Sequence, residues 1–406
     1  MKNIFDTTSI VDIDNKTVIC RVDYNVPFNP LTHEIADENR ILESVPTINH
    51  LLKHNCKIIL CSHLGRPKGQ VINELKMKRI HRSLSSILDK KVILSSDTIG
   101  KDSFKTVKEL KPRDILLLEN LRFHKEEEEN DFKFAKILAS LGEIYVNDAF
   151  GVSHRAHASL DAITNFLPSY AGILMQKEIK MLNRIIKSPK LPFTVILGGA
   201  KVSDKISIID NLQKKANTFL IGGGMAATFI AALGYETGKS PLEPTHIDFA
   251  KALIAGTQNP DFELLIPKDL IVSNKFSIDS LFRTTLVEDI RPDELILDIG
   301  PQTSVLFAKV VNQSKTILWN GPMGVFEFNQ YSKGTKIIAD QLSKLKDAVT
   351  IVGGGSTAEF VRALNLHETM THVSTGGGAT LEFLGGKTLP GIAKLNGKDT
   401  ELDRFS

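Results

Sequence analysis

Short runs of valine, isoleucine and leucine recur along the whole chain. Such runs are typical of strands that are buried on both faces of a parallel sheet. They are VICRV, KIILC, DILLL, EIYVN, TVILG, TFLIG, LLIP, LILDI, TILWN and TIVGG. Segments with helical spacing lie between them, and in one of these a single helix face would hold Ile41, Leu42, Val45, Ile48, Leu51 and Leu52. This alternation of strand and helix predicts α/β layers.

The segment AGILMQKEIKMLNRIIKSPKLP divides the chain into two halves and predicts a helical linker. It is amphipathic, and Pro189 and Pro192 would end a helix before the next strand begins. Because 406 residues are many for one core, we expect two α/β domains of ordinary size.

Composition narrows the possible functions. A hydrophobic content of 42% and a charged content of 24% are typical of a soluble globular protein, and no run approaches the ~18 apolar residues of a membrane span. A net charge of +3 is too small to indicate nucleic-acid or membrane binding, so an anion site needs locally clustered cations. Cys20, Cys56 and Cys61 form no C-x-x-C pair and are expected to be reduced thiols. We therefore expect a cytoplasmic enzyme or binding protein.

Arginine and histidine cluster near predicted strand ends in the first half, in RVDYNVP, ENR, SHLGRP, ENLRFH and YVNDAFGVSHRAH. Arginine forks bind phosphate or carboxylate bidentately, so several that converge would form an anion pocket. Any one arginine could instead cap a helix or pair with an acid. The candidate residues are Asp23, Asn25, Arg40, His63, Arg66, Arg122 and Arg155.

Two other first-half features have simpler interpretations. His154 and His157 could be drawn as zinc ligands, but the sequence offers no cysteine or acidic cluster nearby. The run KEEEEND, 125–131, is expected to be a solvated loop and helix start, because acids are favoured in a first helical turn.

Glycine takes the corresponding places in the second half. The triplets at 222–224 and 353–355 each follow a strand-like run and precede a helix-like run, and a third triplet lies at 376–378. Backbone N–H groups at such a turn can bind a phosphate. A turn from strand to helix can also need glycine for geometry alone, so both interpretations stay open for each isolated triplet.

Two further segments suggest a nucleotide. In LGGAKVSDKI, Lys201 and Lys205 lie four residues apart and are expected on one face of a helix at its N-terminal end, where the helix dipole disfavours cations unless an anion is bound. The segment WNGPMGVFE offers apolar surface and one acid, Glu327, as an adenosine pocket would.

Two common nucleotide motifs fail. Gly238-Lys239-Ser240 resembles the end of a phosphate loop, but Leu233 stands where that loop needs its first glycine, and the context is a helix followed by prolines. The triplets at 222–224 and 353–355 match a dinucleotide fingerprint loosely, yet neither has the acidic residue at the end of the following strand that a dehydrogenase requires.

Eight segments together resemble phosphoglycerate kinase, and the resemblance covers nearly the whole chain. They are RVDYNVP, SHLGRP, LLENLRFH, YVNDAFGVSHRAH, LGGAKVSDKI, IGGGMA, WNGPMGVFE and VSTGGGA. The resemblance implies an α/β fold of two Rossmann-like three-layer lobes with parallel sheets, joined by a helical linker and hinge. It implies a phosphoglycerate-binding lobe at 1–170, a linker helix at 171–190, a nucleotide-binding lobe at 191–389 and a tail at 390–406 that returns to the first lobe.

The resemblance also implies the activity and the residues that carry it. The reaction would be reversible phosphoryl transfer from 1,3-bisphosphoglycerate to ADP, giving 3-phosphoglycerate and ATP, with Mg²⁺, in a monomer that binds neither nucleic acid nor membrane. Catalysis would rest on Arg40, Lys201 and Lys205. Substrate binding would involve Asp23, Tyr24, Asn25, Arg40, His63, Leu64, Gly65, Arg66, Arg122 and Arg155. Nucleotide binding would involve Lys205, Asn320, Glu327, Gly354, Gly355, Ser356 and Thr357, with Glu327 on the ribose.

One departure from the family pattern concerns the metal. The family commonly has aspartate after the glycine triplet, whereas this chain has Ser356. A hydroxyl is a weaker ligand for magnesium than a carboxylate, so the metal ligand is left open. A non-catalytic relative that kept the fold for binding is the remaining alternative; its sign would be the loss of Arg40, Lys201 or Lys205, and all three are present.

Overall fold

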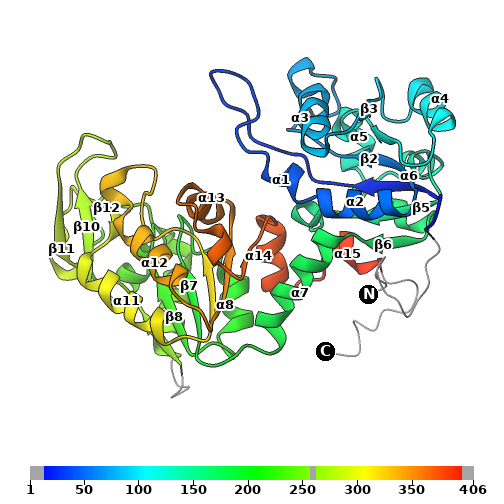
Figure 1. Cartoon of the computed structure of the whole chain (residues 1–406). Coiled ribbons are helices and arrows are strands. Elements are labelled where there is room, and N and C mark those ends of the chain that lie inside the picture. Colours follow the sequence, from blue (N-terminus) through cyan, green and yellow to red (C-terminus); the bar gives the residue numbers. More distant parts are fainter. Residues whose placement is uncertain (1–12, 257–261, 396–406) are drawn as a thin grey trace. The chain divides into compact units, whose positions relative to one another are not determined.

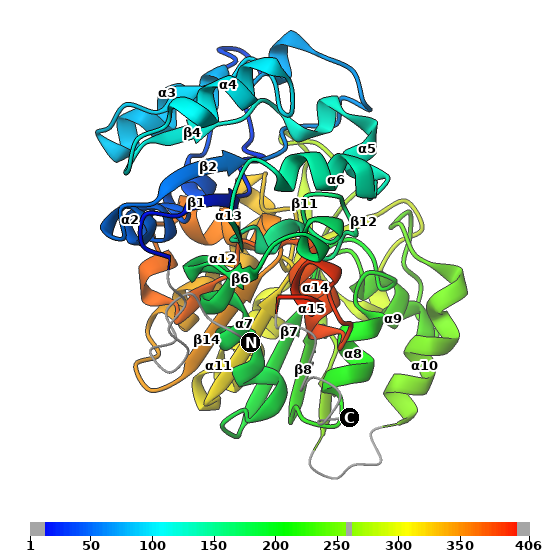
Figure 2. The same ribbon diagram turned by 90° about the vertical axis from the view of Figure 1, so that its right-hand side faces the viewer.

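The computed structural model describes residues 13–256 and 262–395. The chain divides into two compact units, one containing the residues up to Ile179 and those from Thr388 onward, the other Lys180–Lys387 (Figures 1 and 2). Helix α7, Ile173–Lys187, runs across the division. Each unit has its own six-stranded parallel sheet and its own core, which confirms the predicted α/β fold with two parallel-sheet domains.

The first unit is built on a parallel sheet with strand order β3-β4-β2-β1-β5-β6. Its strands are β1 (Thr17–Arg21), β2 (Lys57–Cys61), β3 (Ile93–Leu94), β4 (Ile115–Leu117), β5 (Ile144–Asn147) and β6 (Ser169–Ala171). Its helices, besides α7, are α1 (Asn39–Leu42), α2 (Val45–Lys53), α3 (Lys78–Leu88), α4 (Lys101–Glu109), α5 (Lys125–Glu128), α6 (Phe132–Ala139) and α15 (Pro390–Ala393).

Apolar residues alternate between two buried faces of this sheet. Val18 and Ile58 face the core shared with Leu51 of α2 and Leu84 of α3, whereas Ile19, next to Val18, is equally buried on the other side. Burial on both faces explains why the strands appear in the sequence as unbroken apolar runs.

The helix expected from Ile41 to Leu52 is wrong as a single element. The structure has α1, then Glu43 and Ser44, then α2, whose second residue is Pro46. A proline has no N–H and is tolerated in a first helical turn, so it begins a new helix here. Leu42, expected on the buried face, is 50% exposed as a result.

The second unit has a parallel sheet with strand order β15-β14-β13-β7-β8-β9. Counted along the chain within this sheet, the order is that of a Rossmann fold. Its strands are β7 (Phe193–Leu197), β8 (Thr218–Ile221), β9 (Glu263–Leu265), β13 (Thr316–Asn320), β14 (Val349–Gly353) and β15 (His372–Val373). Its helices are α8 (Ile206–Leu212), α9 (Ala226–Ala232), α10 (Ile247–Ala255), α11 (Pro301–Gln313), α12 (Lys333–Ser343), α13 (Gly355–Ala363) and α14 (Gly378–Leu384).

One predicted parallel strand is wrong. The run LILDI forms β12 (Leu295–Ile299), which pairs antiparallel with β10 (Asp269–Ser273) in a separate three-stranded sheet completed by β11 (Phe282–Leu286). Ile296 through Ile299 are all buried, including Asp298, so β12 has the same unbroken burial as a strand of a parallel sheet. Burial, not strand direction, determines that pattern.

The end of the described chain belongs to the first unit. The Asn147 amide Nδ2 donates a hydrogen bond to the Gly391 carbonyl over 2.8 Å, and the Gly391 N–H donates to the Ser153 carbonyl over 2.9 Å. Residues 396–406, the greater part of the predicted tail, and residues 1–12 lie outside the described residues. In the described part of the chain, no helix is both long enough and apolar enough to cross a membrane.

Candidate functional site

Four strand ends in the first unit present the predicted phosphoglycerate residues. Asp23 and Asn25 follow β1, His63 follows β2, Arg122 follows β4 and Arg155 follows β5. The order of the sheet changes direction at β1, which has β2 on one side and β5 on the other. Ligands of open α/β sheets bind outside the carboxyl ends of the strands at such a point.

Direct contacts join these loops. Arg40 of α1 donates a hydrogen bond to the Asp23 carboxylate. The Gly65 N–H donates to Asn25 Oδ1 over 2.9 Å, and Arg122 Nη1 donates to the Gly65 carbonyl over 2.7 Å. The structure therefore brings most of the predicted arginine set to one edge of the sheet. Arg155 is half-buried there, and Arg66 is exposed.

Tyr24 and Leu64, also predicted to bind substrate, have side chains in the core. Tyr24 is fully buried, its hydroxyl lies 2.9 Å from Ser44 Oγ, and its backbone N–H donates to Ser62 Oγ. Leu64 is 1% exposed, and Asn120 bonds its N–H and its carbonyl. These side chains shape the loops, and the backbone N–H and carbonyl of both residues already have hydrogen-bond partners within the protein.

Arg21, which sequence analysis missed, lies at the end of β1 and is fully buried. Its Nε donates to Ser159 Oγ over 2.9 Å, its Nη2 lies 3.2 Å from His63 Nδ1, and its Nη1 donates to the Val22 carbonyl. A signal was present, because Arg21 is the one charged residue in the apolar run VICRV, and a buried charge needs partners.

Glu127 corrects the prediction that the run KEEEEND is solvated. Its carboxylate is fully buried and accepts two hydrogen bonds from Ser159, from Oγ over 2.6 Å and from the N–H over 2.9 Å. Its Oε1 also lies 3.9 Å from Arg21 Nη2. The neighbouring Glu128 lies 3.2 Å from Arg122 Nε, an ion-pair distance, although that N–H is not aligned for a hydrogen bond. Two acids of the run thus face buried arginines.

The clustered arginines create a positive potential. Burial, followed by the charges of Arg21, Arg122 and Arg40, lowers the pKa of His63 well below its usual value. Burial and three arginines likewise lower the pKa of His157 to about 3. Both imidazoles are therefore neutral at pH 7, and the pocket attracts an anion through its guanidinium groups.

The second unit has its own change of strand order, between β7 and β13. Lys205 precedes α8 and is 8% exposed, and its ammonium group donates to Asn320 Oδ1 at the end of β13. Burial lowers the pKa of Lys205 to about 8, although Asp204 acts in the opposite direction. The Asn320 Nδ2 atom is buried without a hydrogen-bond partner within the described residues. A buried lysine beside an unpaired amide donor fits an anionic ligand.

Lys201 and Lys205 do not share a helix face, contrary to expectation. Helix α8 begins only at Ile206, and both lysines lie in the preceding turn. Lys201 is exposed, whereas Lys205 is buried. Because the helix begins after both lysines, their four-residue spacing does not place them on one helix face.

The structure gives different surroundings to the glycine triplets at 222–224 and 353–355. A Cβ on Gly223 would lie 2.5 Å from the Gly199 nitrogen and 2.7 Å from the Pro322 carbonyl oxygen, so loop packing and a positive φ explain this glycine without a ligand. By contrast, a Cβ on Gly355 would meet nothing within 4 Å. Gly354 has φ +89° and leads into α13. The N-terminus of α13 is therefore open to a ligand.

Of the other predicted nucleotide residues, one is buried and hydrogen-bonded within the protein, and two are exposed at the surface. Thr357 is buried, and its Oγ1 accepts a hydrogen bond from the Gly321 N–H over 2.8 Å. Ser356 and Glu327 are exposed. Within the described residues, no three His, Cys, Asp or Glu side chains are grouped so that they could hold a metal ion.

Two features lie away from these sites. The Gly238-Lys239-Ser240 turn is bonded to the start of β12, because the Lys239 N–H donates to the Glu294 carbonyl and Ser240 Oγ accepts from the Ile296 N–H.

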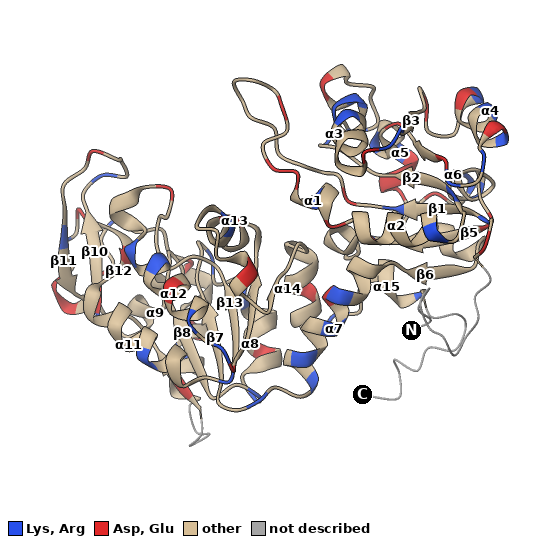
Figure 3. Ribbon diagram, viewed as in Figure 1, with Lys and Arg blue, Asp and Glu red and all other residues tan. Residues whose placement is uncertain are grey.

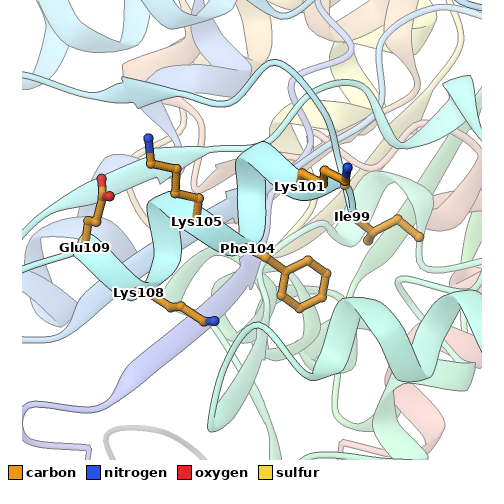
Figure 4. Close-up of a pocket in the computed structure, with 7 residues that line it drawn as sticks. Ile99, Lys101, Phe104, Lys105, Lys108 and Glu109 are labelled. Atoms are coloured by element: carbon orange, nitrogen blue, oxygen red, sulfur yellow. The ribbon is translucent and has the colours of Figure 1, made fainter.

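A cavity of about 600 Å³ lies beside α4, and Figure 4 shows Lys105, Lys108 and Phe104 in its lining. Helix α4 carries charges of both signs (Figure 3), and the cavity contains none of the predicted site residues.

Comparisons with known proteins identify the family of the chain. The family model described as phosphoglycerate kinase matches residues 8–387. Phosphoglycerate kinase of Pelotomaculum thermopropionicum is 46% identical, with 96% of this chain and 98% of the relative covered. That of Clostridium kluyveri is 46% identical, with 97% and 100% covered.

Solved structures give the same result. The phosphoglycerate kinase structure from Coxiella burnetii has a TM-score of 0.84 at 37% identity, covering 95% of this chain and 97% of that one. The structure from Pyrococcus horikoshii has a TM-score of 0.82 at 29% identity, covering 95% and 96%. The chain therefore belongs to the phosphoglycerate kinase family.

Proposed function

We propose that the first unit binds 3-phosphoglycerate or 1,3-bisphosphoglycerate and that the second binds magnesium ADP or ATP. Family membership makes the chain a phosphotransferase of glycolysis that moves a phosphoryl group between 1,3-bisphosphoglycerate and ADP. The observation that carries the assignment is the buried arginine cluster at the first change of strand order, matched by Lys205 and Asn320 at the second.

In this proposal each predicted residue has a stated role, and Arg40 and Lys205 each have two. Arg40, Lys201 and Lys205 stabilise the transferring group. The phosphoglycerate is bound by Asp23, Tyr24, Asn25, Arg40, His63, Leu64, Gly65, Arg66, Arg122 and Arg155. The nucleotide is bound by Lys205, Asn320, Glu327, Gly354, Gly355, Ser356 and Thr357. Tyr24 and Leu64 contribute by shaping the binding loops, since their side chains are buried and their backbone groups already have partners.

Phosphoryl transfer places modest chemical demands on such a site. It needs alignment of the two substrates, cations on the equatorial oxygens and exclusion of water, and no nucleophilic side chain. Lys205 supplies a cation that burial has already stripped of water, so it gains strongly from a phosphate partner. The open N-terminus of α13 adds backbone N–H donors.

Magnesium is proposed to arrive with the nucleotide. Magnesium prefers oxygen ligands and keeps several waters, and it is commonly bound through phosphates and one or two carboxylates. Ser356 offers a hydroxyl at the start of α13 where the family pattern has a carboxylate. The nucleotide phosphates and water would therefore supply most of the coordination.

We also propose how the parts cooperate. The lobe at 1–170 with the tail 390–406 binds phosphoglycerate, the helix at 171–190 links the lobes, and 191–389 binds nucleotide. Closure about this linker would bring the two substrates together. The chain would act as a cytoplasmic monomer; the three buried free thiols fit a reducing compartment.

Calorimetry on two variants tests the division of substrates. We expect Arg40→Met to lose at least about tenfold in affinity for 3-phosphoglycerate, because one charge-assisted contact is worth about 1.5–3 kcal/mol, and to bind magnesium ADP normally. Lys205→Met should show the reverse. Loss of both ligands from one folded variant, or of neither, would contradict the assignment.

A further inference from the structure

We propose that Glu127 and Ser159 are positioning residues that hold Arg21 against His63 Nδ1 and thereby set the tautomer with which His63 meets the substrate. The inference rests on the proposed function of the first unit, because it assigns a purpose to groups behind that pocket. It concerns two residues that belong to none of the predicted site sets.

The chain of contacts is continuous. Glu127 Oε1 accepts from Ser159 Oγ over 2.6 Å, and Ser159 Oγ accepts in turn from Arg21 Nε over 2.9 Å. Arg21 Nη2 lies 3.2 Å from His63 Nδ1. Glu127, Ser159 and Arg21 are fully buried and His63 is 2% exposed, so water does not compete for these bonds.

Arg21 determines which ring nitrogen of His63 carries the proton. A guanidinium group can only donate hydrogen bonds, so His63 Nδ1 must accept and the proton must lie on Nε2. The competing arrangement would have Nδ1 donate to Asp23, but Asp23 Oδ1 is 4.0 Å away, beyond hydrogen-bond length. Distance therefore favours the Nε2–H tautomer.

The Nε2–H group is then what His63 offers to a ligand. Among the described residues, no group bonds Nε2, so this donor remains for the carboxylate, hydroxyl or phosphate of a phosphoglycerate. Burial and three arginines keep the imidazole neutral, since they lower the pKa of His63. A neutral donor of fixed orientation contributes to the placement of the substrate rather than to its charge balance.

Glu127 is well placed to fix Arg21 because its own position is fixed. Both carboxylate oxygens accept hydrogen bonds from Ser159, and the Glu127 carbonyl accepts from the Ala158 N–H over 2.9 Å. The Tyr145 hydroxyl also donates to the Ser159 carbonyl over 2.7 Å. Helix α5, the 157–160 loop and β5 thus form one bonded unit behind Arg21.

Glu127→Gln and Ser159→Ala test the inference in the full-length enzyme. The first substitution presents an amide where two acceptors are needed, and the second removes the hydroxyl that joins Glu127 to Arg21. We expect the KM for 3-phosphoglycerate to rise about tenfold, with kcat changed by less than about twofold and the KM for ATP unchanged, because lost ground-state positioning is uniform binding. Glu294→Gln is the matched control, since Glu294 is a buried partner of Arg283 in the second unit.

A spectroscopic readout separates positioning from general destabilisation. In ¹⁵N-histidine-labelled protein, His63, assigned with a His63→Gln variant, should show a protonated Nε2 and a bare Nδ1. In Glu127→Gln and Ser159→Ala a population with protonated Nδ1 should appear, and in Glu294→Gln it should not. Thermal melting of each variant establishes that it is folded.

The results that overturn the inference are separate from those that overturn the proposed function. The inference is wrong if His63 of the wild type is protonated on Nδ1, a result that does not depend on whether either variant folds. It is also wrong if a folded Glu127→Gln enzyme keeps the wild-type KM for 3-phosphoglycerate and the wild-type His63 tautomer. If 3-phosphoglycerate fails to shift the His63 signals of the wild type, the proposed function of the pocket fails, and the tautomer still decides the inference.

Discussion

Lys205 carries a buried positive charge, and the group that accepts a hydrogen bond from its ammonium is neutral. Its ammonium bonds an amide oxygen, Asn320 Oδ1, and Asp204 acts only at a distance. Desolvation therefore favours the neutral amine and lowers the pKa of Lys205 to about 8. A bound phosphate would reverse that preference, so the proposed nucleotide would favour the charged form of Lys205.

A dependence of stability on pH follows from this residue. Between the folded pKa of about 8 and the usual 10.5, the unfolded chain binds more protons than the folded chain, so stability rises with pH through that window. From about pH 7 to about pH 9.5 the gain from Lys205 is about 2 kcal/mol. Lys205→Met should lack it.

Urea unfolding followed by Trp319 fluorescence measures this effect. Trp319 is the single tryptophan of the chain and is buried in the second unit beside Asn320, so its emission reports on that unit. Lys201→Met is the matched control, because Lys201 is exposed in the same turn. Equal pH dependence in the wild type and Lys205→Met would show that Lys205 is not desolvated.

Ser356 supplies a second prediction at this scale. A carboxylate at this position at the start of α13 could contact magnesium, so Ser356→Asp should lower the magnesium concentration that gives half-maximal turnover. The measurement is a coupled assay that consumes the acyl phosphate made from 3-phosphoglycerate and ATP. Lys239→Ala, in a turn bonded to β12, should leave activity and magnesium dependence intact. An unchanged dependence in Ser356→Asp would place the residue away from the metal.

Residue types and motifs in the sequence were enough to predict the arginine set, but not the buried residues that position it. Asp23, Asn25 and Arg122 stand in recognisable segments after strands, and the structure brings them together. Arg21 and Glu127 were missed because each interrupts a pattern that suggests an ordinary strand or a solvated helix start. The lone charge of Arg21 in an apolar run indicates that it needs partners, but no local pattern identifies Glu127 and Ser159 as those partners.

At the scale of elements, the apolar runs in the sequence predict where the strands lie. They predict neither where each helix begins nor whether a strand is parallel to its neighbours. Pro46 divides a helix that apolar spacing alone would join, and the turn before α8 takes in both lysines that were expected on it. Strand β12 has the burial of a parallel strand in an antiparallel sheet. Apolar periodicity records which faces are covered, and neither strand direction nor exact helix starts follow from it.

The glycine loops of the second unit give a prediction about packing. Gly223 and Gly234 both have positive φ, +65° and +91°, but only Gly223 is crowded by neighbouring backbone. Gly234→Ala should cost about 1 kcal/mol, the strain of a left-handed backbone at a residue with a Cβ. Gly223→Ala should cost at least about 3 kcal/mol, because the Cβ must also displace the Gly199 and Pro322 loops.

The two alanine variants are compared by urea unfolding at one pH, again through Trp319. Because the substitution and the sign of φ are the same in both, their difference isolates the close approach of the loops. Equal destabilisation would mean that the loops after β7, β8 and β13 yield easily, and that the close contacts around Gly223 do not require glycine.

At the scale of the whole molecule, the two proposed binding sites lie in different compact units. The Arg21 and Arg122 cluster lies in the first unit, and the Lys205 and Asn320 pair lies in the second. In the proposal, each unit binds only one of the two substrates. The central claim is therefore that turnover requires the units, linked through α7, to close when both substrates are bound.

Small-angle X-ray scattering tests this claim most directly. The enzyme is measured alone, with 3-phosphoglycerate, with magnesium ADP and with both, a combination that contains no transferable acyl phosphate. The account predicts a smaller radius of gyration with both ligands than with either alone, and no such decrease in Arg40→Met. An unchanged radius in wild-type enzyme that calorimetry shows to be saturated with both ligands would contradict it.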